Sequence, residues 1–185
     1  MKKLLTGLLV TPGLLSVSLF IKTDSVSAHG YVQSPPARGY QGQLDYQNLG
    51  WTDAFNIYGN VISNPQSLEA PKGFPESGPA DGRIASANGG LGQIGDFVLD
   101  NQTSSRWKKT SISTGSNIFT WKYTAPHKTT KWHYYMTKTG WDQNAPLKRS
   151  ELELIVTINH DRSPATNNLS HTIKIPKERS GYHNL

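Results

Sequence analysis

The segment from Glu151 to Ile158 alternates polar and apolar side chains more cleanly than any other part of the chain. Leu152, Leu154, Val156 and Ile158 recur at every second position, which is the period of a β-strand with one buried face. We therefore expect a strand here, with these four side chains on one face.

Other segments share this strand-like character, because they are short and rich in aromatic and β-branched residues. They are residues 97–99, 118–125, 131–138 and 170–175. By contrast, the chain from Gly30 to about Gly92 is rich in Gly, Pro, Asn, Gln and Ser and shows no sustained period. These patterns, without a convincing amphipathic helix, predict an all-β fold: an antiparallel β-sandwich of immunoglobulin or fibronectin III type with a long loop region containing short helices.

The first 28 residues are typical of an export signal. Lys2 and Lys3 precede a mostly apolar run over residues 4–21, and Val26-Ser27-Ala28 offers the small side chains that a signal peptidase accepts. A membrane anchor is the alternative, but Pro12 and Gly13 interrupt the run, and a spanning helix needs about 20 apolar residues. We expect residues 1–28 to be a signal peptide and the chain to be secreted.

Residues 29–185 are long enough for one domain with its own core. The chain has no cysteine, which excludes disulfides and thiolate metal sites. Its basic charge is mild, and the basic run at residues 106–109 is too short for a nucleic-acid site. We therefore expect a monomer with no nucleic-acid partner, and no membrane partner once the signal is removed.

Cleavage after Ala28 would make His29 the amino terminus. An amino-terminal histidine offers two metal-binding nitrogens, the α-amino group and ring Nδ1. A third nitrogen from a distant histidine would complete the all-nitrogen set that suits Cu(II). Among the six histidines, His127 is the natural candidate, because it follows a predicted strand and Pro126.

Three other histidines have simpler explanations. His133 and His171 fall inside predicted strands, and His160 lies in a predicted turn, so we interpret all three as structural. Glu69 lies between prolines in the loop-rich region and is either a solvated loop charge or part of a site. The Gly-rich stretch from Asn88 lacks the Lys and helix of a phosphate-binding loop and is interpreted as a turn.

The stretch His29-Gly-Tyr-Val-Gln-Ser-Pro-Pro-Ala-Arg38 resembles the mature start of the chitin-binding type 4 proteins, the auxiliary activity family 10 lytic polysaccharide monooxygenases. Further segments resemble that family in the same order along the whole mature chain. They are residues 65–69, 72–75, 78–86, 119–122, 124–127 and 141–142.

The resemblance implies a site and a reaction. His29 and His127 would hold one copper ion as a histidine brace, Ala125 would limit access to its axial face, and Glu69 would position the oxygen co-substrate. An external reductant and dioxygen or hydrogen peroxide would then drive oxidative cleavage of crystalline chitin at the anomeric carbon. Trp51, Phe55 and Tyr58 are candidates for substrate stacking, although they could equally pack the loop region itself.

Two departures from the family pattern stand out. Ser63 occupies a position that is often an exposed aromatic in the family, and family members continue past residue 183 into a last strand. We therefore expect the domain at residues 29–185 to be C-terminally incomplete. Two alternatives stay open: a non-catalytic chitin-binding protein or adhesin on the same fold, and a copper carrier, which the single methionine after the signal disfavours.

Overall fold

The computed structural model describes residues 29–125 and 127–185. The predicted signal peptide at residues 1–28 and Pro126 lie outside the described residues. Among the described helices, none has the length and apolar character needed to cross a membrane.

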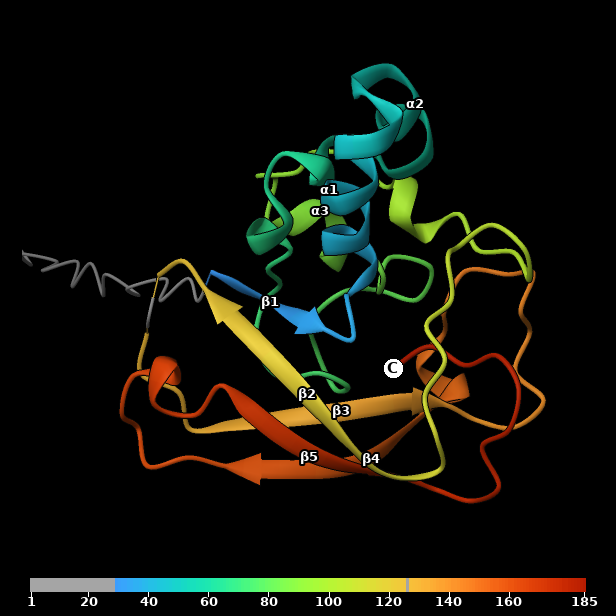
Figure 1. Cartoon of the computed structure of the whole chain (residues 1–185). Coiled ribbons are helices and arrows are strands. Elements are labelled where there is room, and N and C mark those ends of the chain that lie inside the picture. Colours follow the sequence, from blue (N-terminus) through green and yellow to red (C-terminus); the bar gives the residue numbers. More distant parts are fainter. Residues whose placement is uncertain (1–28, 126) are drawn as a thin grey trace, which may run out of the picture.

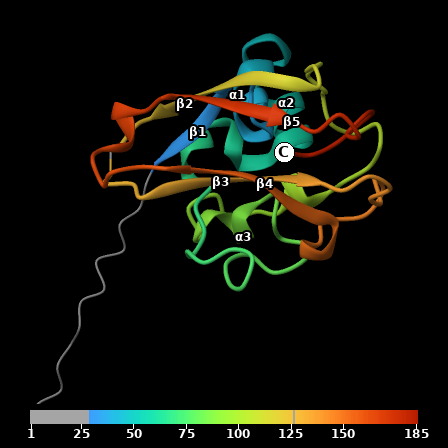
Figure 2. The same ribbon diagram turned by 90° about the horizontal axis from the view of Figure 1, so that it is seen from below.

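Two antiparallel sheets form the body of the molecule. The first has the order β1-β2-β5 and consists of β1 (Gly30–Ser34), β2 (Gly115–Tyr123) and β5 (Ser170–Ile175). The second pairs β3 (Lys131–Thr137) with β4 (Leu152–Asn159). Figure 2 shows the sheets as two separate layers, with β2 and β5 in one and β3 and β4 in the other. The predicted β-sandwich is confirmed.

The core between the sheets draws side chains from both layers. Phe119 and Ile173 project from the first sheet, Trp132, Tyr134 and Met136 project from the second, and each is at most 8% exposed. Burying a large apolar side chain stabilises a fold by about 1.5–3 kcal/mol. This sandwich core therefore holds the two layers together without any disulfide.

The alternation predicted for β4 is interrupted. Tyr134 pairs with Val156 while its neighbour Tyr135 pairs with Leu154, so Ile155 is an extra residue on β4. A bulge of this kind reverses which face the following residues occupy. Val156 packs against the sandwich core, but Leu154 is 45% exposed. The expectation that Leu154 shares one face with Val156 and Ile158 was wrong.

The region before β2 holds more helix than its composition indicates. α1 (Arg38–Leu49) has 12 residues, and α2 (Trp51–Tyr58) follows it directly. Figure 1 shows both standing on one side of the sandwich, above β1. α1 buries Gly39, Gln41 and Gly42 rather than large apolar residues. The helix therefore lacks the apolar period by which sequence patterns reveal helices.

Close contacts explain why the buried face of α1 carries glycine. A Cβ placed on Gly42 would lie 2.7 Å from Cγ of Tyr58, and one on Gly39 would lie 2.8 Å from Cγ2 of Val61. The helical core comprises the buried residues Ala54, Tyr58, Val61, Ile62, Ile94, Leu99 and Trp107. Short 3-10 turns complete the structure: Gly59–Ile62, Pro65–Ser67, Val98–Asp100, Arg149–Glu151 and Ala165–Asn167.

The strand expected at residues 97–99 is absent from the described structure, and a 3-10 turn at Val98–Asp100 stands there instead. The turn points Leu99 into the helical core, where it is 1% exposed. It also lets the Asp100 carboxylate accept hydrogen bonds from the backbone N and Oγ of Ser86, at 2.9 and 2.7 Å. The stretch from Asn88 is a turn as expected: α3 (Ala87–Gly90) contains left-handed φ values at Asn88 and Gly89.

Candidate metal centre

His29 immediately precedes β1 and is held by the end of β2. Gly30 pairs with Tyr123, and the carbonyl of His29 accepts hydrogen bonds from the backbone N–H groups of Thr124 at 2.9 Å and Ala125 at 3.4 Å. A Cβ on Gly30 would lie 2.4 Å from Cδ1 of Tyr123. Only glycine at this position lets the Tyr123 ring lie across the backbone beside His29.

His127 lies two residues beyond Ala125, in the loop that joins β2 to β3. Its carbonyl accepts hydrogen bonds from the backbone N–H of Ala165 at 3.0 Å and from Oγ1 of Thr129 at 3.3 Å. An isolated bridge between Lys128 and Pro164 fixes the next residue. The backbones of the two predicted ligands are thus brought to the same end of the sandwich by the pairing of β1 with β2.

Glu69 and Gln93 approach His29 from the helical region. His29 Nδ1 lies 3.7 Å from Oε1 of Glu69, and His29 Nε2 lies 3.4 Å from Oε1 of Gln93. The Gln93 amide donates to Oε2 of Glu69 at 3.1 Å, which links the two side chains. Glu69 is only 9% exposed, so it is not the solvated loop charge of the simpler interpretation.

The donor atoms on His29 fit a metal. Its Nδ1 is buried and has no hydrogen-bond partner among the described residues. A buried polar nitrogen without a partner costs about 1–3 kcal/mol, a cost that metal coordination removes. The described residues contain no group of three or more His, Cys, Asp or Glu side chains suited to a metal.

Gln93 is the residue of this site that sequence reasoning missed. It belongs to the Gly-rich stretch interpreted as a simple turn, and its backbone N–H donates to Gly90 at 3.0 Å. The turn packs closely on the segment that carries Glu69, because a Cβ on Gly90 would lie 2.2 Å from the carbonyl oxygen of Ser67. Only this tertiary contact distinguishes Gln93 from any other loop amide.

The three predicted substrate aromatics differ in exposure. Trp51 and Phe55 are 49% and 38% exposed, and their rings stack with centroids 5.7 Å apart. Tyr46 meets Trp51 edge-on at 5.8 Å. Tyr58 is 3% exposed, and its hydroxyl donates to Oδ2 of Asp45 at 2.6 Å. Tyr58 offers no face to a ligand, because its ring fills the space that Gly42 leaves, and its expected stacking role is not met in this structure.

The remaining histidines make local contacts. His133 Nδ1 lies 2.8 Å from Oγ1 of Thr157 on the neighbouring strand, and His160 Nε2 lies 3.0 Å from Oγ of Ser163. His171 is buried, with Nδ1 2.6 Å from the hydroxyl of Tyr134, and burial lowers the pKa of its imidazole. Their structural interpretation is in keeping with these contacts.

Comparison with known proteins identifies the family to which the chain belongs. The profile of a family described as "Lytic polysaccharide mono-oxygenase, cellulose-degrading" matches residues 29–185. GlcNAc-binding protein A of Shewanella oneidensis is 42% identical over 184 residues, which are 98% of this chain and 36% of that protein. The lytic chitin monooxygenase of Enterococcus faecalis is 39% identical over 182 residues, 98% of this chain and 87% of that protein. The chain thus spans little more than a third of the GlcNAc-binding proteins it matches.

Solved structures agree with this assignment. A Bacillus amyloliquefaciens CBM33 in complex with Cu(I) superposes with a TM-score of 0.82 and 61% identity, covering 84% of this chain and 86% of that one. The catalytic domain of a lytic polysaccharide monooxygenase from Listeria monocytogenes gives 0.70 and 43%, covering 84% and 85%. By sequence and by fold, the chain belongs to the lytic polysaccharide mono-oxygenase family, in agreement with its resemblance to auxiliary activity family 10.

Proposed function

We propose that the exported chain is a copper-dependent monooxygenase that binds crystalline chitin and cleaves it oxidatively at the anomeric carbon. The observation that carries the proposal is the position of His29 beside the loop of His127. The carbonyl of His29 accepts hydrogen bonds there from the backbone N–H groups of Thr124 and Ala125. Two relatives support the chemistry: one is described as a lytic chitin monooxygenase, and the other was solved with Cu(I).

Copper would be held by nitrogen atoms of two residues. Cleavage after Ala28 would free the amino group of His29, which would bind together with its Nδ1, and the imidazole of His127 would supply the third nitrogen. Three nitrogen donors suit Cu(II). When bound, copper supplies one-electron chemistry with dioxygen or hydrogen peroxide after an external reductant has reduced it.

The neighbouring side chains would perform other tasks. Oε2 of Glu69 accepts the Gln93 hydrogen bond, while Oε1 faces Nδ1 of His29 at 3.7 Å. A carboxylate in this position can orient a small oxygen co-substrate or hold a proton for it. Ala125 adds only a methyl group next to His29 and would limit access to one side of the metal. We assign Glu69 and Ala125 to positioning rather than to metal binding.

Substrate binding would use an open surface rather than a cleft, because a crystalline polymer cannot enter a deep pocket. Trp51 and Phe55 form an exposed stacked pair, and aromatic faces of this kind pack well on pyranose rings. We propose chitin in preference to cellulose, because relatives are described as GlcNAc-binding or chitin-cleaving, although the family description mentions cellulose. We further propose that the mature protein is secreted as a monomer.

A non-catalytic chitin-binding protein or adhesin is the second candidate. It is supported by the relatives described as GlcNAc-binding protein A, of which this chain spans little more than a third. Such a binder has no need of a chelating amino terminus. The two candidates therefore differ in whether His29 must be the first residue.

Mass spectrometry of soluble products separates the candidates. The correctly cleaved, copper-loaded chain is incubated with β-chitin and ascorbate, and oxidised chitooligosaccharides are expected only when reductant is present. A matched chain with one extra alanine before His29 should bind chitin equally well but release no oxidised products. Chitin binding by both chains with no oxidised products from either would favour the adhesin.

A further inference from the structure

Gln93 bridges two polar side chains of the candidate site. Its amide nitrogen lies 3.1 Å from Oε2 of Glu69, and its amide oxygen lies 3.4 Å from Nε2 of His29. An ionised carboxylate only accepts hydrogen bonds, so the end of the Gln93 amide that faces Glu69 must be its NH2 group. The carbonyl oxygen of Gln93 is thereby turned toward the imidazole of His29.

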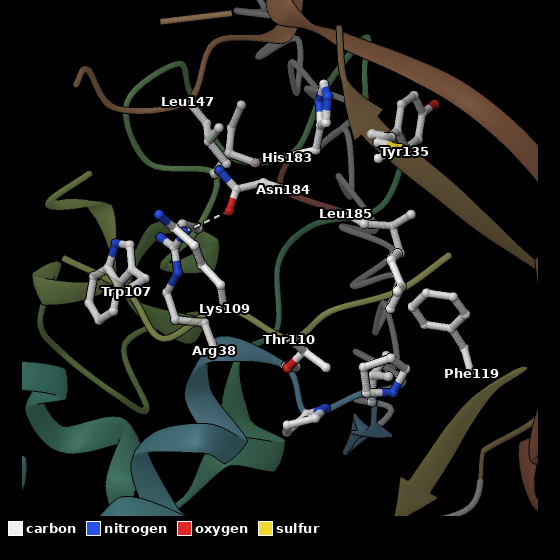
Figure 3. A pocket seen from close by; sticks show the side chains of 18 of the residues that line it. Arg38, Trp107, Lys109, Thr110, Phe119, Tyr135, Leu147, His183, Asn184 and Leu185 are labelled. Atoms are coloured by element: carbon white, nitrogen blue, oxygen red, sulfur yellow. Dashed lines mark hydrogen bonds between the residues drawn. The ribbon is translucent and has the colours of Figure 1, made fainter. Parts of the chain in front are cut away.

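The same rule orients amides elsewhere in the molecule. The Arg38 guanidinium only donates hydrogen bonds, and it donates to the side-chain oxygens of Gln102 at 2.9 Å and Asn184 at 2.8 Å. Figure 3 shows the oxygen of Asn184 turned toward Arg38. The amide nitrogen of Gln102 then donates to the carbonyl of Gln143 at 3.1 Å. A charged group at one end of an amide thus decides which atom the other end offers.

The orientation of Gln93 matters because a neutral imidazole carries its proton on one of its two nitrogens. The Gln93 carbonyl is an acceptor, so it favours a proton on Nε2 of His29. The other ring nitrogen, Nδ1, is buried without a hydrogen-bond partner among the residues that the structure describes. The Oε1 atom of Glu69, 3.7 Å from Nδ1, is beyond hydrogen-bonding distance. These contacts leave the lone pair on Nδ1, the ring atom that the proposed function assigns to copper.

The backbone around Gln93 is fixed by its surroundings. Ala87 and Leu91 have φ angles of 51° and 53°, although neither is glycine. Left-handed conformations are unfavourable for such residues and persist only where neighbouring contacts impose them. Ile94 supplies such contacts, because it is 4% exposed in the helical core and its carbonyl accepts a hydrogen bond from Nδ2 of Asn60 at 3.1 Å. The turn therefore holds Gln93 in place, although Gln93 itself is exposed.

We propose that Gln93 is a positioning residue: oriented by Glu69, it accepts a hydrogen bond from Nε2–H of His29 and so keeps the lone pair on Nδ1. The inference rests on the proposed function, because it concerns the nitrogen through which His29 would bind copper. A histidine that ligates a metal commonly donates its second N–H to an acceptor, which fixes both the tautomer and the ring orientation. Gln93 is that acceptor, and Glu69 is the group that directs it.

The tautomer of His29 is measured in the metal-free exported chain that begins at His29. Nitrogen NMR of protein with isotope-labelled histidines reports which ring nitrogen carries the proton, at a pH about two units above the usual imidazole pKa. The signals of His29 are those missing from a His29→Ala variant. We expect Gln93→Leu to lower the ratio of Nε2–H to Nδ1–H by roughly fivefold, because the acceptor of the Nε2 proton is removed.

A second glutamine provides the matched control. Gln66 lies close in sequence to Glu69, but its amide donates to Oδ1 of Asn64 at 3.4 Å. Gln66→Leu should therefore leave the tautomer ratio of His29 unchanged. Calorimetric titration with Cu(II) gives a second measurement, in which Gln93→Leu should lose about tenfold in affinity and Gln66→Leu should match the wild type.

Exchanging two side chains separates orientation of His29 from a merely structural role. In the double variant Glu69→Gln with Gln93→Glu, the amide at position 69 donates to the carboxylate at position 93, which still accepts from Nε2 of His29. We expect this variant to keep the tautomer ratio and copper affinity of the wild type within a few-fold.

Two outcomes would overturn the proposal: equal tautomer ratios in the wild type and Gln93→Leu, or a double variant that behaves like Gln93→Leu. The ratio is measured without copper or chitin. It therefore decides the role of Gln93 even if the exported chain releases no oxidised products, the result that would count against the proposed function.

Discussion

The sandwich and the helical region are built by different means, yet each supplies half of the candidate site. The sandwich core is made of large side chains from paired strands, and it carries His29 and His127 through the pairing of β1 with β2. The helical region packs glycine faces of α1 against aromatic and aliphatic neighbours, and it carries Glu69 and Gln93. Backbone pairing therefore positions the two proposed metal ligands, and side-chain packing positions the groups around them.

The largest effect is expected when a proposed copper ligand carried by the sandwich is removed. His127→Ala should weaken copper binding by roughly a hundredfold or more, because two nitrogens of His29 alone form an incomplete site. The fold should survive, since His127 contributes to its loop through its carbonyl. Calorimetric titration with Cu(II) measures the loss, and His133→Ala is the matched control on a histidine outside the site. Equal losses in both variants would contradict the assignment.

The next largest effect is expected from a substitution in the helical region that leaves His29 and His127 unchanged. Glu69→Gln keeps the size of the side chain but removes its charge beside His29. We expect copper affinity to stay within a few-fold, while oxidation of chitin slows by roughly 10–100-fold. Product release followed by mass spectrometry gives the rate, and Glu76→Gln, in an exposed loop, serves as control. Unchanged turnover in Glu69→Gln would remove this residue from the site.

A substitution on α1 tests whether the close glycine contacts of this helix stabilise the helical region. Gly42→Leu would force a side chain into the space of Tyr58, because a Cβ at this position would lie only 2.7 Å from Cγ of that ring. We expect the free energy of unfolding to fall by about 3 kcal/mol, with the effect concentrated in this region. Gln47→Leu on the exposed side of the same helix should change it by less than about 0.5 kcal/mol. Denaturant titration compares the two variants.

A smaller effect is expected at the exposed aromatic pair. Trp51→Ala should weaken binding to chitin by about tenfold, because it removes the larger face of the Trp51–Phe55 stack. Ile118→Ala is the control, since Ile118 is 64% exposed but lies on a strand of the sandwich. Sedimentation of the protein with chitin measures both variants. If the Ile118 variant weakened as much as the Trp51 variant, chitin would not be using the helical surface.

The smallest effect concerns pH and belongs to the sandwich. Burial lowers the pKa of His171 below its usual value, so below about pH 6.5 the unfolded chain takes up a proton that the folded chain resists. Stability from this group is therefore complete above that pH and declines as the pH falls toward the lowered value. Thermal unfolding as a function of pH should show the decline, and His171→Gln should flatten it. An identical slope in the variant would assign the effect to other groups.

Sequence patterns predicted the sandwich well, because a strand with one buried face leaves a period of two. The strand at Ser170–Ile175 was predicted at its observed bounds, and β3 differs from its predicted range by one residue. α1 escaped prediction because its buried face is Gly39, Gln41 and Gly42, which carry no apolar period. The position of Leu154 could not be foreseen, since a bulge depends on the partner strand.

The candidate site also contains residues that the sequence could predict and one that it could not. His29 and His127 stand out in the sequence by the signal cleavage pattern and by family resemblance, and the structure brings their backbones to one end of the sandwich. Gln93 has no local signature, because its contacts with His29 and Glu69 arise only when the Gly-rich turn packs beside Glu69. Residues that act through packing are the ones that a linear pattern leaves out.

Under the proposed function, the contacts that hold His29 have a consequence for how its amino terminus is produced. The backbone N–H groups of Thr124 and Ala125 donate hydrogen bonds to its carbonyl, and the ring of Tyr123 packs against Gly30. None of these contacts involves the backbone nitrogen of His29. A chain cut one residue too early would keep every one of them and fold equally well. The two products would therefore have the same fold at this terminus. Under the proposed function, fidelity at this terminus would therefore rest entirely on the peptidase.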